Sequence, residues 1–292
     1  MTETLYPGGT FLSNPYENLW IYYLVGIPEK LTDISRNEFF IGNWEEEGFS
    51  FLFFSVPCDE MIEKLVSEDP GIKLIDRYEM SGEQWHGDKI ESYTTGTFCV
   101  SPPWKIPFVN RSDLNHILLD PGVVFGTGRH QTTEDCLGYI EYLFNEKNEQ
   151  IDSVLDIGTG TGLLAIGAAV LGCRKVMALD FNLLAVKTAR HNIIINSLEE
   201  KILAFQGKGE DFISLPADLV IANIHYDVMK NLVESPDFLN HKWFILSGLL
   251  NSEAIKIEQR LREKGIYVIE SIAPDQVWNT ILGCSLPLSI DK

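Results

Sequence analysis

A glycine-rich run in the middle of the chain constrains the fold more than any other feature. Residues 154–162 read VLDIGTGTG, so three alternate glycines follow an apolar stretch, and small and apolar residues follow over 163–171. Glycine permits a sharp turn and lets backbone N–H groups approach a ligand closely, while a helix that begins there presents its positive end. The run therefore predicts a strand, a ligand-binding turn and a helix.

Two acids indicate which cofactor such a turn would bind. A dinucleotide fingerprint is spaced G-x-G-x-x-G, whereas this run reads D-x-G-x-G-x-G with Asp156 before the first glycine. Asp156 would repel a pyrophosphate but would suit a cofactor that carries an ammonium and no phosphate, which favours S-adenosylmethionine. A second acid, Asp180, ends the β-like run 175–180 and suits ribose hydroxyls. The alternatives are that Asp156 only fixes the turn and that Asp180 ends an ordinary parallel strand.

The length and composition predict a globular protein of two domains. The chain has 292 residues with 45% apolar content, which allows a substantial core. No apolar stretch approaches the roughly 20 residues that span a bilayer. The first residues, Met1 to Gly9, lack a signal pattern, so we expect a cytoplasmic protein with no membrane partner. The cysteines are scattered without a C-x-x-C pair, which predicts reduced thiols and no metal site: Cys58, Cys99, Cys136, Cys173 and Cys284.

The charge balance limits the partners. Lys and Arg number 23 against 42 Asp and Glu, a formal net charge of −19. This charge opposes direct binding to a nucleic-acid backbone and favours a basic partner. The alternative is that the acidity only keeps the protein soluble.

Hydrophobic patterning predicts the order of the elements. Strands at 19–25, 49–56 and 72–78 with a helix at 59–67 indicate a small α+β module. A turn-rich connection follows, with the aromatic anchors and prolines Trp85, Trp104, Pro102, Pro103 and Pro107. The expected divisions are 1–82 for the module, 83–115 for the connection and 116–292 for the second domain.

The second domain alternates strand-like and helix-like stretches, as expected for a parallel sheet covered by helices on both faces. Threonines open the helix expected from Thr132, and Asn182 can cap the next helix. The expected helices are 132–144, 183–196, 226–232 and 252–264, and the expected strands are 217–223, 243–247, 267–272 and 277–282.

Three segments together resemble one family. They are DPGVVFGTGRHQTT at 120–133, the glycine run, and IANI at 221–224, and they resemble the PrmA family. The resemblance implies methylation of amino groups of ribosomal protein L11. It also implies an α/β fold in which a small α+β (ferredoxin-like) substrate-recognition domain precedes a Rossmann-like, seven-stranded class I methyltransferase domain. The resemblance covers nearly the whole second half and extends to residues 82–85 and 102–104. Over residues 1–80 it rests mainly on the order of the expected strands and helices.

The resemblance also implies site residues. Thr133, Gly158, Asp180 and Asn223 match positions with which the family binds its cofactor, and residues 125–128 match a flexible loop beside it. The departures from the family pattern are Arg129 and Gln131. Asp156 and Gly160 of the glycine run complete the set. The expected cofactor-binding residues are Phe125, Gly126, Thr127, Gly128, Thr133, Asp156, Gly158, Gly160, Asp180 and Asn223.

Methyl transfer from a sulfonium needs alignment and desolvation more than dedicated catalytic groups. The amide oxygen of Asn223, at an expected strand end, can accept from an incoming amine. Enzymes that methylate planar nitrogens typically follow this position with two prolines and an aromatic residue, whereas here the run is Asn223-Ile224-His225-Tyr226, which favours an aliphatic amine. The alternative for Asn223 is a turn residue that ends a strand.

Two histidines are candidate proton acceptors, because neutral imidazole is available near pH 7. We predict that His130 acts beside the cofactor and orders its loop, and we give His225 the lesser claim to contact the amine. The glycines at 126 and 128 would let the loop close over bound cofactor, and a static connection is the alternative.

The sequence thus predicts an S-adenosylmethionine-dependent protein lysine N-methyltransferase that acts as a monomer on a basic ribosomal protein. Three alternatives stay open: an N-methyltransferase of another protein or a small amine, an inactive cofactor-binding interaction module, and a dehydrogenase.

Overall fold

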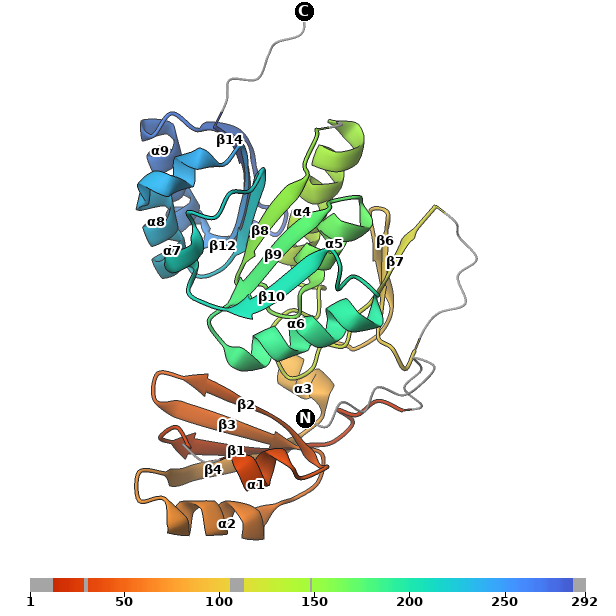
Figure 1. Ribbon diagram of the computed structural model, residues 1–292, viewed down its shortest axis with the longest axis vertical. Coiled ribbons are helices and arrows are strands. Elements are labelled where there is room, and N and C mark those ends of the chain that lie inside the picture. The colour runs from red at the N-terminus through yellow and green to blue at the C-terminus, as the bar shows by residue number, and fades with distance from the viewer. Residues whose placement is uncertain (1–12, 29–30, 106–112, 148, 286–292) are drawn as a thin grey trace, which may run out of the picture.

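The computed structural model describes residues 13–28, 31–105, 113–147 and 149–285 (Figure 1). The segment Met1 to Gly9 and Pro107 lie outside these residues. Within the described part of the chain, no helix is long and apolar enough to cross a membrane. None of the five cysteines forms a disulfide bond.

The first module is an antiparallel sheet with helices on one face. Its strands are β1 (Leu19–Val25), β2 (Phe40–Glu46), β3 (Phe49–Phe54) and β4 (Lys73–Met80), and its helices are α1 (Thr32–Ser35) and α2 (Asp59–Glu68). The strand order β2-β3-β1-β4 and the βαββαβ sequence define a ferredoxin-like fold, as expected. The apolar side chains that pack between the sheet and its helices include Tyr22, Leu24, Leu52, Phe54 and Ile62.

The sequence analysis did not predict β2. This strand reads FIGNWEE, in which Gly42 and Asn43 interrupt the β-forming residues. A tight turn nevertheless pairs it with β3, because Glu47 and Gly48 both adopt positive φ, of 50° and 84°. Two positive φ angles match the twist of the flanking strands of a hairpin.

A small third sheet occupies the segment interpreted as a connection. It consists of β5 (Tyr93–Thr95), β6 (Phe98–Ser101) and β7 (Asn115–Leu118), and α3 (Gly82–His86) precedes it. Phe98, Val100 and Ile117 are buried in the core of the second domain. The turn signals of this segment thus surround short strands, and the domain limits themselves stay a prediction.

The second domain is built on a seven-stranded sheet of order β10-β9-β8-β11-β12-β14-β13. The first five strands in this order are parallel, and β14 runs antiparallel to both its neighbours. This confirms the predicted Rossmann-like fold class. The strands are β8 (Ser153–Ile157), β9 (Lys175–Asp180), β10 (Ile202–Gln206), β11 (Leu219–Asn223), β12 (Trp243–Leu250), β13 (Tyr267–Ile272) and β14 (Trp278–Cys284).

Helices cover both faces of the large sheet (Figure 1). On one face, side chains of α4 (Gln131–Glu141), α5 (Leu163–Val170) and α6 (Leu183–Ile195) join the core. A π-helical turn, Tyr142–Glu146, continues α4. The other face is covered by α7 (Gly209–Phe212), α8 (Tyr226–Glu234), the 3₁₀ turn Pro236–Asn240 and α9 (Asn251–Glu263). The central strands are therefore buried on both sides, which explains their continuous apolar sequences.

The helix caps are partly as expected. The Asn182 Oδ1 atom accepts from the Leu184 N–H at 2.9 Å and caps α6 as predicted. The expectation that threonine opens α4 is wrong, because His130 is the cap and its Nδ1 atom faces the Thr132 N–H at 3.4 Å. Thr132 and Thr133 lie in the first turn of α4 and are buried.

The free face of the first sheet packs against the second domain. Leu19 and Phe53 share a buried cluster with Val123, Val124 and Leu184. The Asn182 Nδ2 atom donates to the Glu45 carbonyl at 3.2 Å, which fastens β2 to the start of α6. In Figure 1 this strand is the part of the module nearest α6. The module therefore lies beside the carboxyl end of β9.

Candidate cofactor and active site

The glycine run forms a tight turn between β8 and α5. Gly158, Gly160 and Gly162 have φ of 73°, 54° and 86°, in the left-handed region that favours glycine. A Cβ atom on Gly158 would collide with the Ile224 side chain, and one on Gly160 would lie 2.8 Å from the Phe125 carbonyl oxygen. Glycine is therefore required at both positions by conformation and by space.

Asp156 is the last but one residue of β8 and is 1% exposed. Its Oδ2 atom accepts from the Thr159 hydroxyl at 2.5 Å, while its Oδ1 atom is buried without a hydrogen-bond partner. Burial raises the pKa of Asp156 to about 7, the hydrogen bonds from the Thr159 hydroxyl and the Ala165 backbone oppose this rise, and the charge of Asp180 adds to it. The site thus holds a buried carboxyl with one unsatisfied acceptor atom.

Asp180 ends β9, the strand beside β8, and connects this strand to the glycine turn. Its Oδ2 atom accepts from the Gly160 N–H at 3.1 Å, and its Oδ1 atom accepts from the Asn182 N–H at 2.9 Å. Burial raises the pKa of Asp180, and the backbone hydrogen bonds oppose this effect. A carboxylate has about four acceptor positions, so Asp180 retains capacity for ligand hydroxyls.

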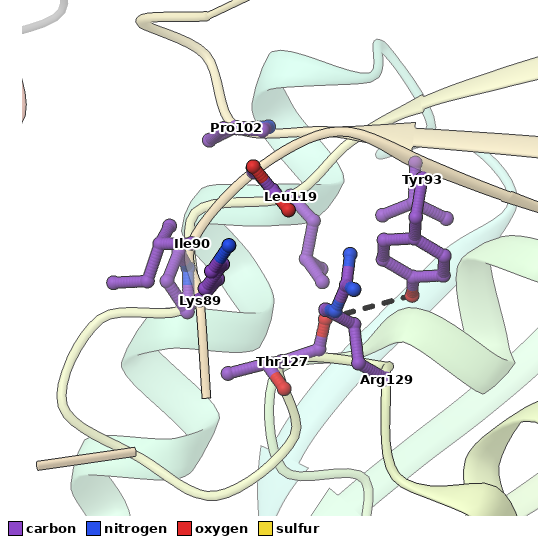
Figure 2. A pocket seen from close by; sticks show the side chains of 10 residues that line it. Lys89, Ile90, Tyr93, Pro102, Leu119, Thr127 and Arg129 are labelled. Carbon is purple, nitrogen blue, oxygen red and sulfur yellow. Dashed lines mark hydrogen bonds between the residues drawn. The ribbon is translucent and has the colours of Figure 1, made fainter. Parts of the chain in front are cut away.

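The loop of residues 125–128 lies against the glycine turn. The Thr161 hydroxyl donates to the Gly126 carbonyl at 2.8 Å. On the other side, the Tyr93 hydroxyl donates to the Thr127 carbonyl at 3.5 Å, the contact drawn in Figure 2. Gly126 and Gly128 have φ of 117° and 85°. Phe125, at the start of the loop, is 66% exposed, so the loop presents an uncovered aromatic ring.

Asn223 ends β11, next to β8 in the sheet, and faces the first turn of α4. Its Nδ2 atom donates to the Thr132 hydroxyl at 3.2 Å and to the Thr133 hydroxyl at 3.5 Å. The predicted site residues Asn223 and Thr133 are thus in contact. Sequence reasoning missed Thr132, although the adjacent threonine pair was visible.

His130 connects to this group through Thr132. The His130 Nδ1 atom lies 2.8 Å from the Thr132 hydroxyl oxygen. Its ring packs edge-on between Phe125 and Trp278, with centroid distances of 6.0 and 5.6 Å. Trp278 starts β14, and no local pattern in the sequence indicated that it would reach the site. His225 is exposed at the N-cap of α8 and makes no side-chain capping hydrogen bond.

The two departures from the family pattern have structural partners. Arg129 lies over the Tyr93 ring, 5.4 Å from its centroid, and pairs with Asp88 at 3.4 Å. With Tyr93 and Thr127 it lines a pocket of only about 20 Å³ (Figure 2), enough for about one water. Gln131 donates to the Asp135 carboxylate at 2.8 Å within α4. The partners of both side chains, Tyr93, Asp88 and Asp135, lie outside the glycine turn.

A larger cavity lies beside Asp180. It has a volume of about 390 Å³ and is lined by Phe181, Asn182 and Gln206 from the second domain and by Phe40 and Asn43 from β2. This volume is in the range of small-molecule sites. The glycine turn, Asp180 and Asn223 are not among the residues that line the cavity. The carboxyl ends of β8, β9 and β11 therefore combine a glycine turn, two acids and an amide, and the cavity lies next to them between α6 and β2. Among the described residues, no group of side chains is arranged to hold a metal ion.

The chain is similar in sequence to proteins of one family. The family model described as ribosomal protein L11 methyltransferase (PrmA) matches residues 59–285. A relative from Bacillus pumilus, named ribosomal protein L11 methyltransferase, is 30% identical over an alignment of 224 residues that covers 73% of this chain and 69% of the relative. One of the same name from Staphylococcus carnosus is 36% identical over 192 residues, 64% of this chain and 59% of the relative.

A solved structure is also similar. It is described as ribosomal protein L11 methylase from Lactobacillus delbrueckii subsp. bulgaricus, and the match covers 66% of this chain and 97% of that chain with a TM-score of 0.58 and 26% identity. The family match covers most of the residues that the fold and the candidate site use. The resemblance inferred from the three sequence segments is confirmed, and the chain belongs to the PrmA family.

Proposed function

We propose that this protein transfers methyl groups from S-adenosylmethionine to lysine amines of ribosomal protein L11. The observation that carries the proposal is the convergence of the glycine turn, Asp180 and Asn223 at the ends of three adjacent strands. Open α/β sheets bind ligands at this edge. The names of the relatives support the choice of protein substrate.

The side chains fit the proposed cofactor. The buried, unpartnered Asp156 Oδ1 atom is an acceptor that an ammonium group could satisfy, directly or through a water. A nearby positive charge would lower the raised pKa of Asp156 and favour its ionised form. We assign Asp180 to ribose hydroxyls and Gly158, Gly160, Thr133 and residues 125–128 to the walls of the same site. When bound, the cofactor would supply a methyl group activated by the adjacent sulfonium charge.

The residues of this chain would orient the accepting amine. A lysine amine has a free pKa of about 10.4, so forming its neutral state at pH 7 costs about 4 to 5 kcal/mol. The Asn223 Oδ1 atom can accept an N–H of the neutral amine while its Nδ2 atom stays bonded to Thr132. This arrangement would direct the lone pair of the amine nitrogen toward the methyl group of the cofactor. A desolvated site would lower the free energy needed to deprotonate the amine.

The net charge of −19 suits a basic protein substrate. The alternatives predict different results in one assay. Labelled S-adenosylmethionine is incubated with purified L11 and, separately, with fractions of a cell extract. Label on L11 supports the proposal, whereas label only on another protein or on small amines assigns a different substrate.

Two further alternatives are separated by binding and by a variant. Tight binding of S-adenosylhomocysteine with no transfer by either the wild type or Asn223→Ala would indicate an inactive interaction module. Saturable binding of NAD without binding of S-adenosylhomocysteine would indicate a dehydrogenase. The matched control for Asn223→Ala is Asn240→Ala, at an exposed asparagine of the turn after α8.

A further inference from the structure

The Asp120 carboxylate is a buried junction between the first module and the second domain. Asp120 is 5% exposed, and its Oδ1 atom accepts from the Tyr16 hydroxyl at 2.7 Å and from the Gly122 N–H at 2.9 Å. Tyr16 belongs to the module, because its carbonyl accepts from the Gly82 N–H directly after β4. Burial and the Asp120 charge raise the pKa of Tyr16, so its hydroxyl keeps the proton that it donates.

Asn192 of α6 connects Asp120 to the glycine turn through hydrogen bonds. Its side chain is fully buried and makes three hydrogen bonds of 2.8 Å. The Oδ1 atom accepts from the Asp120 N–H, and the Nδ2 atom donates to the carbonyls of Asp120 and Thr161. Thr161 in turn donates to the Gly126 carbonyl. One amide side chain therefore joins the Asp120 segment to the turn that follows Gly160.

Helix α3, which follows β4 of the module, also holds the segment between Asp120 and the loop of residues 125–128. The Trp85 indole N–H donates to the Val123 carbonyl at 3.0 Å. The His86 Nε2 atom lies 3.1 Å from the Gly122 carbonyl oxygen. The chain runs directly from this clamped segment into Phe125 and the loop. Displacement of the module would therefore move both loops that border the proposed cofactor site.

We propose that Asp120 and Asn192 are positioning residues, through which the placement of the first module sets the geometry of the two cofactor-side loops. The inference rests on the proposed cofactor site. Because coupling between two sites is reciprocal, a protein substrate that holds the module in this placement would also tighten cofactor binding.

Two tyrosines of the module provide a matched test. Tyr16→Phe removes the hydroxyl that bonds Asp120 and leaves the ring in place. Tyr22→Phe is the control, because Tyr22 is also buried in the same module. Its hydroxyl donates to Asp59 at 3.3 Å and accepts from the Cys58 N–H at 2.8 Å, on the face away from the second domain. Each variant loses one buried hydroxyl, so each should lower the melting temperature of the protein.

The measurements are S-adenosylhomocysteine affinity by calorimetry and amide hydrogen exchange of residues 125–128 and 159–162 in the ligand-free protein. We expect Tyr16→Phe to weaken the affinity about 5-fold or more and to speed exchange in both loops. Tyr22→Phe should change neither, although it lowers the melting temperature.

The outcomes separate the two levels of inference. If the wild type binds S-adenosylhomocysteine and the two variants behave alike, the coupling is wrong and the proposed cofactor site stands. If the wild type does not bind it, the proposed function is wrong and the coupling inference is overturned with it.

Discussion

Asn223 and Thr132 lie 91 positions apart in the chain, and a hydrogen bond of 3.2 Å joins the asparagine amide nitrogen to the threonine hydroxyl. The bond connects the end of β11 to the first turn of α4. It turns the amide oxygen of Asn223 toward Gly248, where an added Cβ would lie 3.1 Å from that oxygen. The amide is therefore oriented by Thr132, with a longer bond to Thr133, and the glycine leaves space in front of its acceptor atom.

Removing either partner of this bond should lower transfer to different extents. Asn223→Ala removes the proposed amine acceptor and should reduce kcat about 100-fold, the size of effect seen when one polar group that positions a reacting atom is lost. Thr132→Val keeps the shape but removes the shorter of the two hydrogen bonds that orient the amide, and should reduce kcat about 10-fold. Steady-state kinetics with saturating cofactor measures both, with Thr94→Val at an exposed site of β5 as the control.

The second prediction concerns Gly160. Gly160→Ala should weaken S-adenosylhomocysteine binding about 10-fold or more, because the new methyl group would press on the Phe125 carbonyl and displace the loop. The variant also carries the cost of a left-handed backbone in alanine, roughly 1 kcal/mol. Gly265→Ala is the control, since Gly265 has φ of 80° with nothing within 4 Å of an added Cβ. Equal affinities in the two variants would rule out the close approach as the cause.

The third prediction uses the raised pKa of Asp156. A carboxyl whose folded pKa lies above its unfolded value stabilises the fold fully below the unfolded pKa, and this stability is lost as the pH rises through the folded pKa. For Asp156 the loss runs from the ordinary aspartate pKa of 3.8 to the folded pKa of about 7, and is on the order of 4 kcal/mol when complete. Asp156→Asn should therefore stabilise the ligand-free protein at pH 8.

The same substitution should weaken cofactor binding, because the proposed ammonium partner loses its counter-charge. Chemical denaturation at pH 8 and at pH 4 measures the first effect, and calorimetry with S-adenosylhomocysteine measures the second. The expected stabilisation at pH 8 shrinks toward pH 4. A stability difference that stays constant between the two pH values would show that Asp156 does not titrate in the folded protein near neutrality.

His130 allows a test of two roles in one side chain. His130→Ala removes the cap of α4 and should cost about 1 kcal/mol of stability, whereas His130→Asn restores a capping oxygen and should recover most of it. If His130 only orders the loop, His130→Asn should also recover transfer. Restored stability without restored transfer in His130→Asn would assign the imidazole itself a part in the reaction.

The elements that could be predicted from the sequence are those with local signals. The glycine turn needs positive φ at Gly158 and Gly160, and only glycine adopts it freely, so the motif predicted the conformation that the structure has. Asp180 and Asn223 end apolar strands, and strand ends in a parallel sheet meet at one edge. The position of these residues could therefore be predicted before their contacts were known.

The features that were missed depend on long-range contacts. Trp278 reaches His130 only because β14 pairs with β12 on the far side of the sheet. The short strands β5 and β6 lie among turn residues, and Phe98 and Val100 of β6 are buried in the same core as α4 and α5. Asn192 has no motif of its own, since its three hydrogen bonds join segments from different parts of the chain.

The central claim is that this chain transfers methyl groups to lysine amines of ribosomal protein L11. The most direct measurement incubates the protein with labelled S-adenosylmethionine and purified L11 from the same organism, followed by mass mapping of the product. The account predicts label on L11, located on lysine side chains and lost with Asn223→Ala. Unlabelled L11 in the presence of measurable cofactor binding would contradict it.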